Sequence, residues 1–240
     1  MEKNIFYETY FSNHILPRKG DVTKSSIQIK SRIWDKTFSE FLPKDKSSAI
    51  LDLGCGEGSI VYWLHKKGFL NSKGIDISLE QINVGKRLGI KNISQCEMTE
   101  FLENNQNYYD VIFARDLLEH FEKDQILKIL RLIFKSLKKN SSLIIQVPNG
   151  ESPFGNRVRY GDFTHEIAFT SGSLSQILKV TGFEKINFYP TKPPVLGIKS
   201  FFRYVLWKMV EKFYKLLLFA EVGSTSKVVS QNIIAVAKKD

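Results

Sequence analysis

Residues 50–58 read Ile-Leu-Asp-Leu-Gly-Cys-Gly-Glu-Gly, an apolar run that leads into three glycines at alternate positions. From Ser59 onward the residues follow a helical pattern, so the glycines stand between a predicted strand and a predicted helix. Glycine at such a junction lets the backbone turn sharply and lets a ligand lie against it without an intervening side chain. The stretch therefore predicts a ligand-binding turn at the carboxyl end of a strand.

Short apolar segments and helical segments alternate on both sides of this turn. The predicted strands are 49–53, 74–77, 93–95, 111–114 and 143–147, and the predicted helices between them are 59–67, 79–88 and 123–137. This alternation is typical of a parallel sheet with helices on both faces, and mostly apolar strands fit a sheet buried on both sides. We expect a doubly wound, Rossmann-like α/β fold.

The two ends of the chain depart from this alternation. Residues 1–45 are expected to form an N-terminal helical cover, because an apolar stripe from Ile27 to Leu42 has helical spacing and Pro43 ends it. Near the other end, a helix at 173–180 and strands at 183–189 and 232–237 are predicted.

A helical insert at 190–228 separates the last two predicted strands. It opens with three prolines and continues as an aromatic-rich helix from Lys199 to Phe219. We predict a single domain across residues 1–240, with the cover and the insert as additions to it.

Composition sets limits on function. The chain has 240 residues, 42% of them hydrophobic, and a net charge of +10. This charge suits an acidic substrate, nucleic acid or an anionic membrane, but a lysine-rich composition alone also explains it. Two cysteines without metal-type spacing fit a reducing compartment, and no signal peptide or apolar run of about 18 residues is present, so we expect a cytoplasmic protein.

Acidic residues around the glycine turn indicate which cofactor it binds. Asp76 ends the next strand, where a carboxylate can accept hydrogen bonds from both ribose hydroxyls of an adenosine. A nicotinamide dinucleotide would call for glycine where Ser59 stands, and it would bring a pyrophosphate next to Asp52 and Glu57. S-adenosylmethionine carries an ammonium and a sulfonium and no phosphate, so the charge pattern favours it.

Five segments resemble, in order, the motifs of class I S-adenosylmethionine-dependent methyltransferases. The segments are 50–60, 74–78, 96–98, 109–120 and 137–149. The resemblance covers about residues 45–190 and the last strand. It implies a seven-stranded, mostly parallel sheet whose last strand is antiparallel and lies between the fifth and sixth, with the insert hanging from the hairpin that joins the last two strands.

The same resemblance implies which residues contact the cofactor. They are Asp52, Gly54, Cys55, Gly56, Asp76, Ile77, Glu97, Met98, Arg115 and Leu117. Glu97 stands where the family more often has an aspartate that contacts the adenine amino group.

The loop after the fifth strand is expected to hold the acceptor. The run from Asn149 to Phe183 resembles methyltransferases of surface-polysaccharide and nucleotide-sugar pathways, which implies a small-molecule acceptor such as a sugar or sugar-phosphate hydroxyl. The residues expected to bind it are Asn149, Arg157, Arg159 and Tyr160. The arginines also admit a simpler interpretation as solvated loop residues.

His165 is the first candidate for general base, because a histidine ordinarily titrates near working pH. His120 competes with it, and Asp162 is the third catalytic candidate. Each histidine also admits a purely structural interpretation. Asp116, Glu119 and His120 match a pattern with which quinone-pathway O-methyltransferases can hold a divalent ion, but no other feature calls for a metal and none is expected.

Two rival functions and the role of the insert remain open at this point. A nucleic-acid methyltransferase would use the positive charge, yet Arg115-Asp116-Leu117-Leu118 stands where amino-methylating DNA enzymes have an Asp/Asn-Pro-Pro-aromatic motif. Intact cofactor motifs argue against a non-catalytic binding module. Helix 199–219 is interpreted either as a lid or self-association face, or as a peripheral membrane contact with its lysines towards anionic lipid.

Overall fold

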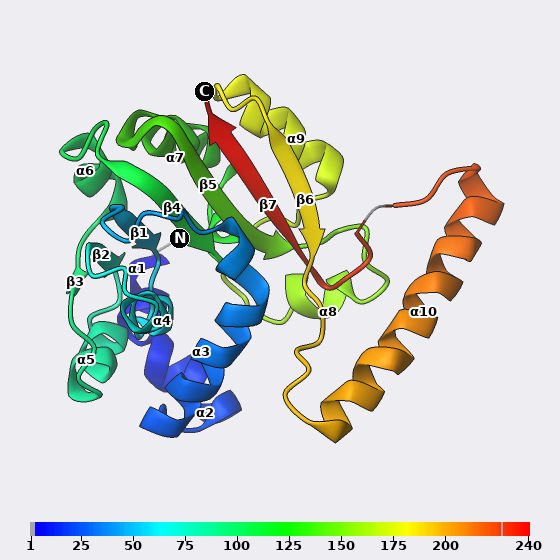
Figure 1. The fold of residues 1–240 in the computed structure, drawn as a ribbon, viewed down its shortest axis with the longest axis horizontal. Helices are drawn as coiled ribbons and strands as arrows, with labels where there is room; N and C mark the ends of the chain where they lie inside the picture. The colour runs from blue at the N-terminus through cyan, green and yellow to red at the C-terminus, as the bar shows by residue number, and fades with distance from the viewer. Residues whose placement is uncertain (1–2, 227) are drawn as a thin grey trace.

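A seven-stranded sheet forms the centre of the protein (Figure 1). The computed structural model describes residues 3–226 and 228–240. The strands are β1 (Ile50–Leu53), β2 (Ser72–Asp76), β3 (Ile93–Gln95), β4 (Tyr109–Arg115), β5 (Leu137–Pro148), β6 (Ile186–Pro190) and β7 (Asn232–Lys239). Their order in the sheet is β3-β2-β1-β4-β5-β7-β6.

Strands β1 to β5 pair in parallel, and β7 runs antiparallel between β5 and β6. The predicted Rossmann-like sheet, with its antiparallel last strand in this position, is therefore confirmed. All carboxyl ends of the parallel strands meet at one edge, which is where ligands bind in such sheets.

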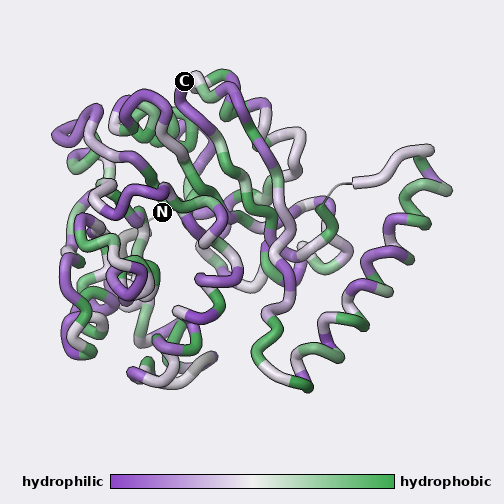
Figure 2. The backbone as a smooth tube through the Cα atoms, in the orientation of Figure 1, coloured by the Kyte–Doolittle hydropathy of each residue, from purple (hydrophilic) through white to green (hydrophobic). Residues whose placement is uncertain are grey.

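Helices cover both faces of the sheet and bury its apolar side chains. On one face, α6 (Met98–Glu103), α7 (Lys123–Ser136) and α9 (Ser171–Val180) pack against the sheet. On the other face lie α3 (Lys24–Phe38), α4 (Ser59–Lys66) and α5 (Leu79–Arg87). Figure 2 shows the apolar residues gathered along the central strands.

The N-terminal segment contains more helix than the sequence indicates. Before α3 come α1 (Lys3–Glu8), a π-helix (Phe11–Ile15) and α2 (Leu16–Lys19). Helix α3 begins at a capping box, in which Thr23 and Ser26 each accept a hydrogen bond from the other's backbone N–H. Two short helices that follow strands, α6 and α8 (Gly155–Arg159), were also not predicted.

Strand β5 is longer than predicted because its first half is polar. Leu137 pairs with Tyr109, the register then shifts, and Ser142 pairs with Val111. The residues between them, Lys-Lys-Asn-Ser, carry no apolar run that sequence patterns could detect. The predicted strand begins only at Leu143, where the apolar residues begin, although Ser141 and Ser142 are already buried.

The insert forms one long helix, α10 (Ile198–Val222), which stands away from the sheet (Figure 1). It leaves the sheet after β6 and returns at β7, as the sequence predicted. Among the described residues, no helix is both long and apolar enough to cross a membrane.

Candidate active site

The glycine turn after β1 adopts a backbone conformation that favours glycine. Gly54, Gly56 and Gly58 have φ angles of 68°, 56° and 84°. A Cβ atom on Gly54 would lie 2.9 Å from Cδ1 of Leu117, so a larger residue there would push into the next loop. Any other residue at these three positions would strain the backbone, so glycine is required for the turn to keep this conformation.

Asp76 ties this turn to the end of β2. One of its carboxylate oxygens accepts a hydrogen bond from the backbone N–H of Gly56 at 2.8 Å, and the other accepts from Ser78 at 2.8 Å. Burial raises the pKa of Asp76, and the two backbone donors act in the opposite direction. The carboxylate has further lone pairs and lines the adjoining cavity, so it can accept hydrogen bonds from a ligand.

A cavity of about 270 Å³ opens at the carboxyl edge of the sheet. Six of the ten residues expected at the cofactor line it: Gly54, Asp76, Ile77, Glu97, Met98 and Leu117. Glu97 also caps α6, since its side chain accepts from the backbone N–H of Glu100 at 2.9 Å.

The other four residues of that set lie behind the cavity wall. The backbone N–H of Gly56 donates to Asp76, and the Cys55 side chain packs against Gly74 in β2. Asp52 is buried within β1, where burial raises its pKa to about 7 although Arg115 opposes the shift. Arg115 itself pairs with Asp116 and lies 4.6 Å over the ring of Trp34. Cofactor contact by these four stays a prediction.

Another part of the cavity wall comes from the N-terminal segment, the loop after β4 and the first turn of α7. It consists of Tyr7, Tyr10, Asp116, His120, Phe121 and Gln125. Sequence reasoning did not find the two tyrosines, because nothing local indicates that they meet a loop more than a hundred residues away. Their presence makes the N-terminal segment a part of the site.

A chain of hydrogen bonds connects this wall to the loop after β5. Tyr10 donates to Asp162 at 2.5 Å, and the hydroxyl of Thr164 donates to the same carboxylate at 2.7 Å. Thr164 Oγ1 lies 2.8 Å from Nδ1 of His120. Since the single hydroxyl hydrogen of Thr164 points to Asp162, we assign the His120 proton to Nδ1 and the lone pair to Nε2.

Burial and these hydrogen bonds determine the ionisation of Asp162 and His120. Burial opposes ionisation of Asp162, but the bonds from Tyr10 and Thr164 outweigh it and lower its pKa to about 2. Burial and the neighbouring His165 lower the pKa of His120 to about 4, although Asp162 and Asp116 act in the other direction. His120 is therefore a neutral imidazole at neutral pH, beside an ionised Asp162.

His165 lies behind His120 as seen from the cavity. The two rings meet edge to face with centroids 4.7 Å apart, and Nδ1 of His165 lies 3.1 Å from the carbonyl oxygen of Val158. His120 lines the cavity, whereas His165 is not among the lining residues. The structure thus brings together both candidate bases and places His120, but not His165, in the cavity lining.

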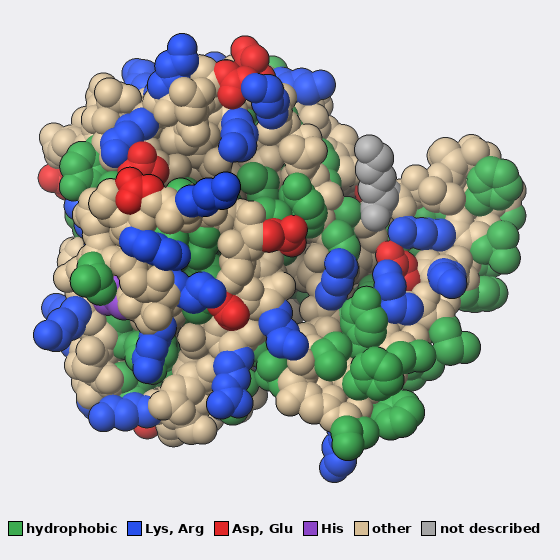
Figure 3. Space-filling model, viewed as in Figure 1, with side chains coloured by type: hydrophobic (Ala, Val, Ile, Leu, Met, Phe, Trp, Pro, Cys, Tyr) green, Lys and Arg blue, Asp and Glu red, His purple; other side chains and the backbone are tan. Residues whose placement is uncertain are grey.

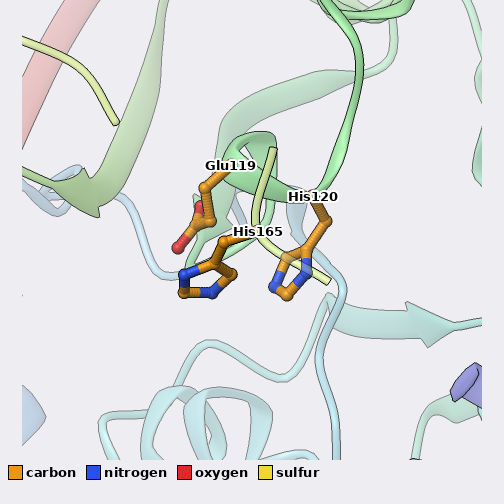
Figure 4. A group of neighbouring side chains, drawn as sticks. All are labelled: Glu119, His120 and His165. Atoms are coloured by element: carbon orange, nitrogen blue, oxygen red, sulfur yellow. The ribbon is translucent and has the colours of Figure 1, made fainter. Parts of the chain in front are cut away.

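Glu119, His120 and His165 form the cluster shown in Figure 4, with one potential ligand atom each within 4.8 Å of the others. Oε2 of Glu119 is buried and has no hydrogen-bond partner among the described residues, and burial raises the pKa of this carboxyl well above its usual range. The sequence grouped Glu119 and His120 with Asp116 instead. The carboxylate of Asp116 turns away to accept from Gln146 at 2.8 Å and to pair with Arg115.

The four residues expected to bind the acceptor do not line the cavity. Asn149 is fully buried: its Nδ2 donates to the carbonyls of Val228 and Ser230 at 2.9 and 3.0 Å, and its Oδ1 accepts from Glu151 at 3.0 Å. Arg159 donates to the carbonyls of His165 and Glu166. Arg157 and Tyr160 are exposed on α8 and just after it. An acceptor contact by any of the four stays a prediction.

Comparison with known proteins matches this chain to one family. A family model described as a methyltransferase domain matches residues 27–187. The chain is 24% identical over 164 residues to phosphoethanolamine N-methyltransferase 3 of Arabidopsis thaliana, covering 63% of this chain and 32% of that protein. It is 27% identical over 165 residues to the ubiquinone biosynthesis O-methyltransferase of Coxiella burnetii, covering 61% of this chain and 70% of that protein.

Solved structures show the same fold. An S-adenosylmethionine-dependent methyltransferase from Archaeoglobus fulgidus superposes with a TM-score of 0.66 at 21% identity, over 98% of this chain and 99% of that one. The chain spans about a third of the length of the plant relatives that it matches, at 32% and 36% of two phosphoethanolamine N-methyltransferases.

Proposed function

Because the chain belongs to the methyltransferase domain family, as a class I S-adenosylmethionine-dependent member, we propose that it methylates a small polar acceptor held between the glycine turn and Tyr10. The observation that carries this proposal is the cavity itself. One wall offers the glycine turn and Asp76, and the facing wall offers a neutral histidine.

The cofactor takes the first wall. Asp76 would accept hydrogen bonds from its ribose hydroxyls, and Glu97 and Met98, which line the cavity after β3, would contact its adenine. The acidic side chains of Asp76, Glu97 and Asp116 suit a ligand that carries an ammonium and a sulfonium. The methyl group then faces the wall formed by Tyr7, Tyr10 and His120.

His120 serves as the general base of the proposed reaction. Nε2 of His120 would take the proton of the acceptor hydroxyl as the acceptor oxygen is methylated. S-adenosylmethionine, when bound, would supply the methyl group and would itself remain as a neutral thioether. Asp162 and Thr164 hold the ring proton at Nδ1 and stabilise the imidazolium that forms. This assignment moves the base from His165, the first candidate from sequence, to the histidine at the cavity.

The acceptor is proposed to be a sugar hydroxyl, in line with the resemblance to surface-polysaccharide pathways and with a cytoplasmic location. Among the described residues, the cavity lining includes no lysine or arginine. A phosphate would lack a cationic partner there, so the reacting end of the acceptor is uncharged, and any phosphate extends outward towards Arg157.

An amine is the second candidate acceptor, favoured by the acidic and aromatic character of the same lining. Tyr7, Tyr10 and Asp116 would attract an ammonium group. The curated relatives named phosphoethanolamine N-methyltransferases are consistent with such an acceptor.

Transfer of a labelled methyl group from S-adenosylmethionine to a panel of acceptors tests the proposal. The panel contains neutral sugars, nucleotide sugars, ethanolamine and phosphoethanolamine. Label found on a sugar hydroxyl supports the first candidate, and label found on nitrogen supports the second. Cofactor binding without turnover on any small molecule, combined with methylation of RNA or DNA, would overturn both.

A further inference from the structure

The outer face of α10 is apolar along the whole helix. Its exposed side chains are Ile198, Phe201, Phe202, Val205, Leu206, Met209, Phe213, Leu216, Leu217, Phe219 and Val222. At helical spacing most of them share one side, which Figure 3 shows as green atoms along the edge turned away from the domain. Ile198, Phe202 and Met209 are 78%, 67% and 64% exposed, so no described part of the chain covers them.

The side of α10 that faces the domain is mixed, with half-buried Trp207, Val210 and Tyr214 beside one buried acid. Glu211 is buried there and pairs with Lys208 at 2.7 Å and Lys215 at 3.0 Å. Tyr214 donates to the carbonyl of Glu151 at 3.4 Å, and Trp207 lies 6.1 Å from Phe154 by ring centroids. The inward side therefore packs on the domain through its own aromatic residues, and it leaves the apolar outer face uncovered by the described residues.

Basic side chains flank the apolar face on both sides. Lys199 and Arg203 lie along one flank, and Lys208, Lys212 and Lys215 along the other, against only two acidic residues in the helix, Glu211 and Glu221. An apolar face bordered by lysine and arginine is the pattern of helices that lie in the surface of an anionic bilayer. The net charge of +10 also favours binding to an anionic bilayer.

We propose that α10 binds the surface of an anionic lipid bilayer, with its apolar face inserted and its basic flanks at the headgroup level. A second copy of the chain is a poorer occupant, because two such faces in contact would bring their basic flanks together. The proposal is independent of the acceptor.

Sedimentation with vesicles tests this proposal on the full chain. Wild-type protein is expected to sediment with vesicles of phosphatidylcholine and phosphatidylglycerol, and much less with phosphatidylcholine alone. Added salt should weaken the binding, since it screens the basic flanks. A double variant, Phe202→Glu with Met209→Glu, should bind the anionic vesicles at least tenfold more weakly.

Leu70→Glu is the matched control, because Leu70 is equally exposed at 70% but lies in the loop before β2. It should bind vesicles within about twofold of wild type, a difference of less than 0.5 kcal/mol. Circular dichroism and S-adenosylmethionine affinity verify that every variant is folded, independently of any acceptor.

Two results would overturn the proposal. One is equal sedimentation of wild type and the double variant with anionic vesicles. The other is a wild-type dimer in analytical ultracentrifugation that becomes monomeric in the double variant, without vesicle binding by either; a second copy would then occupy the face.

Discussion

The phenol of Tyr10 donates a 2.5 Å hydrogen bond to the carboxylate of Asp162, which joins the N-terminal segment to the loop after β5. His14 approaches the same carboxylate at 3.4 Å, and Arg18 donates to the carbonyl of Gly161 at 2.6 Å. These contacts connect the N-terminal segment, which supplies Tyr7 and Tyr10 to the cavity lining, to the loop after β5. The N-terminal segment thus depends on that loop for its position over the site.

Tyr10→Phe should loosen this connection without removing the aromatic wall. We expect the acceptor KM to rise about tenfold, since the loss of one hydrogen bond to a charged group costs about 1.5–3 kcal/mol and part of that appears in acceptor binding. Steady-state kinetics measure the effect. Tyr108→Phe, a tyrosine away from the cavity, is the control; an unchanged KM in both variants would show that the bond does not position the segment.

His120→Gln should lower turnover by about 10² to 10⁴, the usual contribution of a general base, while cofactor affinity stays near wild type. His165→Gln should have a smaller effect, because this ring lies outside the cavity lining. Single-turnover rates with the same acceptor compare the two variants. A larger loss in His165→Gln would return the base to the residue that the sequence placed first.

The lowered pKa of His120 predicts how the free energy of unfolding depends on pH. The pKa of this histidine is 6.5 in the unfolded chain and about 4 in the folded protein. The stability that the neutral ring contributes is therefore present above pH 6.5 and is lost as the pH falls towards 4. This difference corresponds to about 3 kcal/mol.

Buried carboxyls such as Glu119 titrate with the opposite sign, because their pKa is raised and the folded state holds their protons. The informative quantity is therefore the difference in free energy of unfolding between wild type and His120→Gln. Urea unfolding at several pH values should show wild type losing stability relative to the variant between pH 6.5 and 4. A constant difference would mean that His120 is not neutralised by burial.

Asp76→Asn should weaken S-adenosylmethionine binding by about 1–3 kcal/mol, because an amide accepts ribose hydrogen bonds less strongly than a carboxylate. Isothermal titration calorimetry measures this loss. Asp124→Asn, at an exposed position in α7, is the matched control. Equal affinities in wild type and Asp76→Asn would remove Asp76 from the cofactor site.

Asn149→Ala should mainly destabilise the fold. Its buried amide makes three hydrogen bonds to the backbone, and their loss leaves carbonyls unpaired, at a cost of about 2–4 kcal/mol. Urea unfolding measures this loss. Near-normal stability together with a raised acceptor KM would instead support the substrate contact predicted from sequence.

The sheet and the cofactor wall could be predicted because their signals are local. Apolar strands, the glycine turn and Asp76 lie within short stretches whose residue types determine the backbone. The wall that contains Tyr10 and His120 could not be predicted in the same way, because the contact between Tyr10 and Asp162 spans 152 residues and leaves no local pattern. Asn149 illustrates a second limit: a polar residue that follows a strand can equally be a ligand contact or a buried residue that hydrogen-bonds the backbone.

The insert begins and ends at adjoining points of the sheet, since Pro190 in β6 pairs with Ile233 in β7. A segment with such closely spaced ends can be lengthened, shortened or exchanged at small entropic cost, while the strands on either side keep their register. The carboxyl edge that holds Gly54 and Asp76 is built from other strands. Changes in the length or sequence of α10 would therefore alter the surface that the chain presents there and leave the strands that carry Gly54 and Asp76 in place.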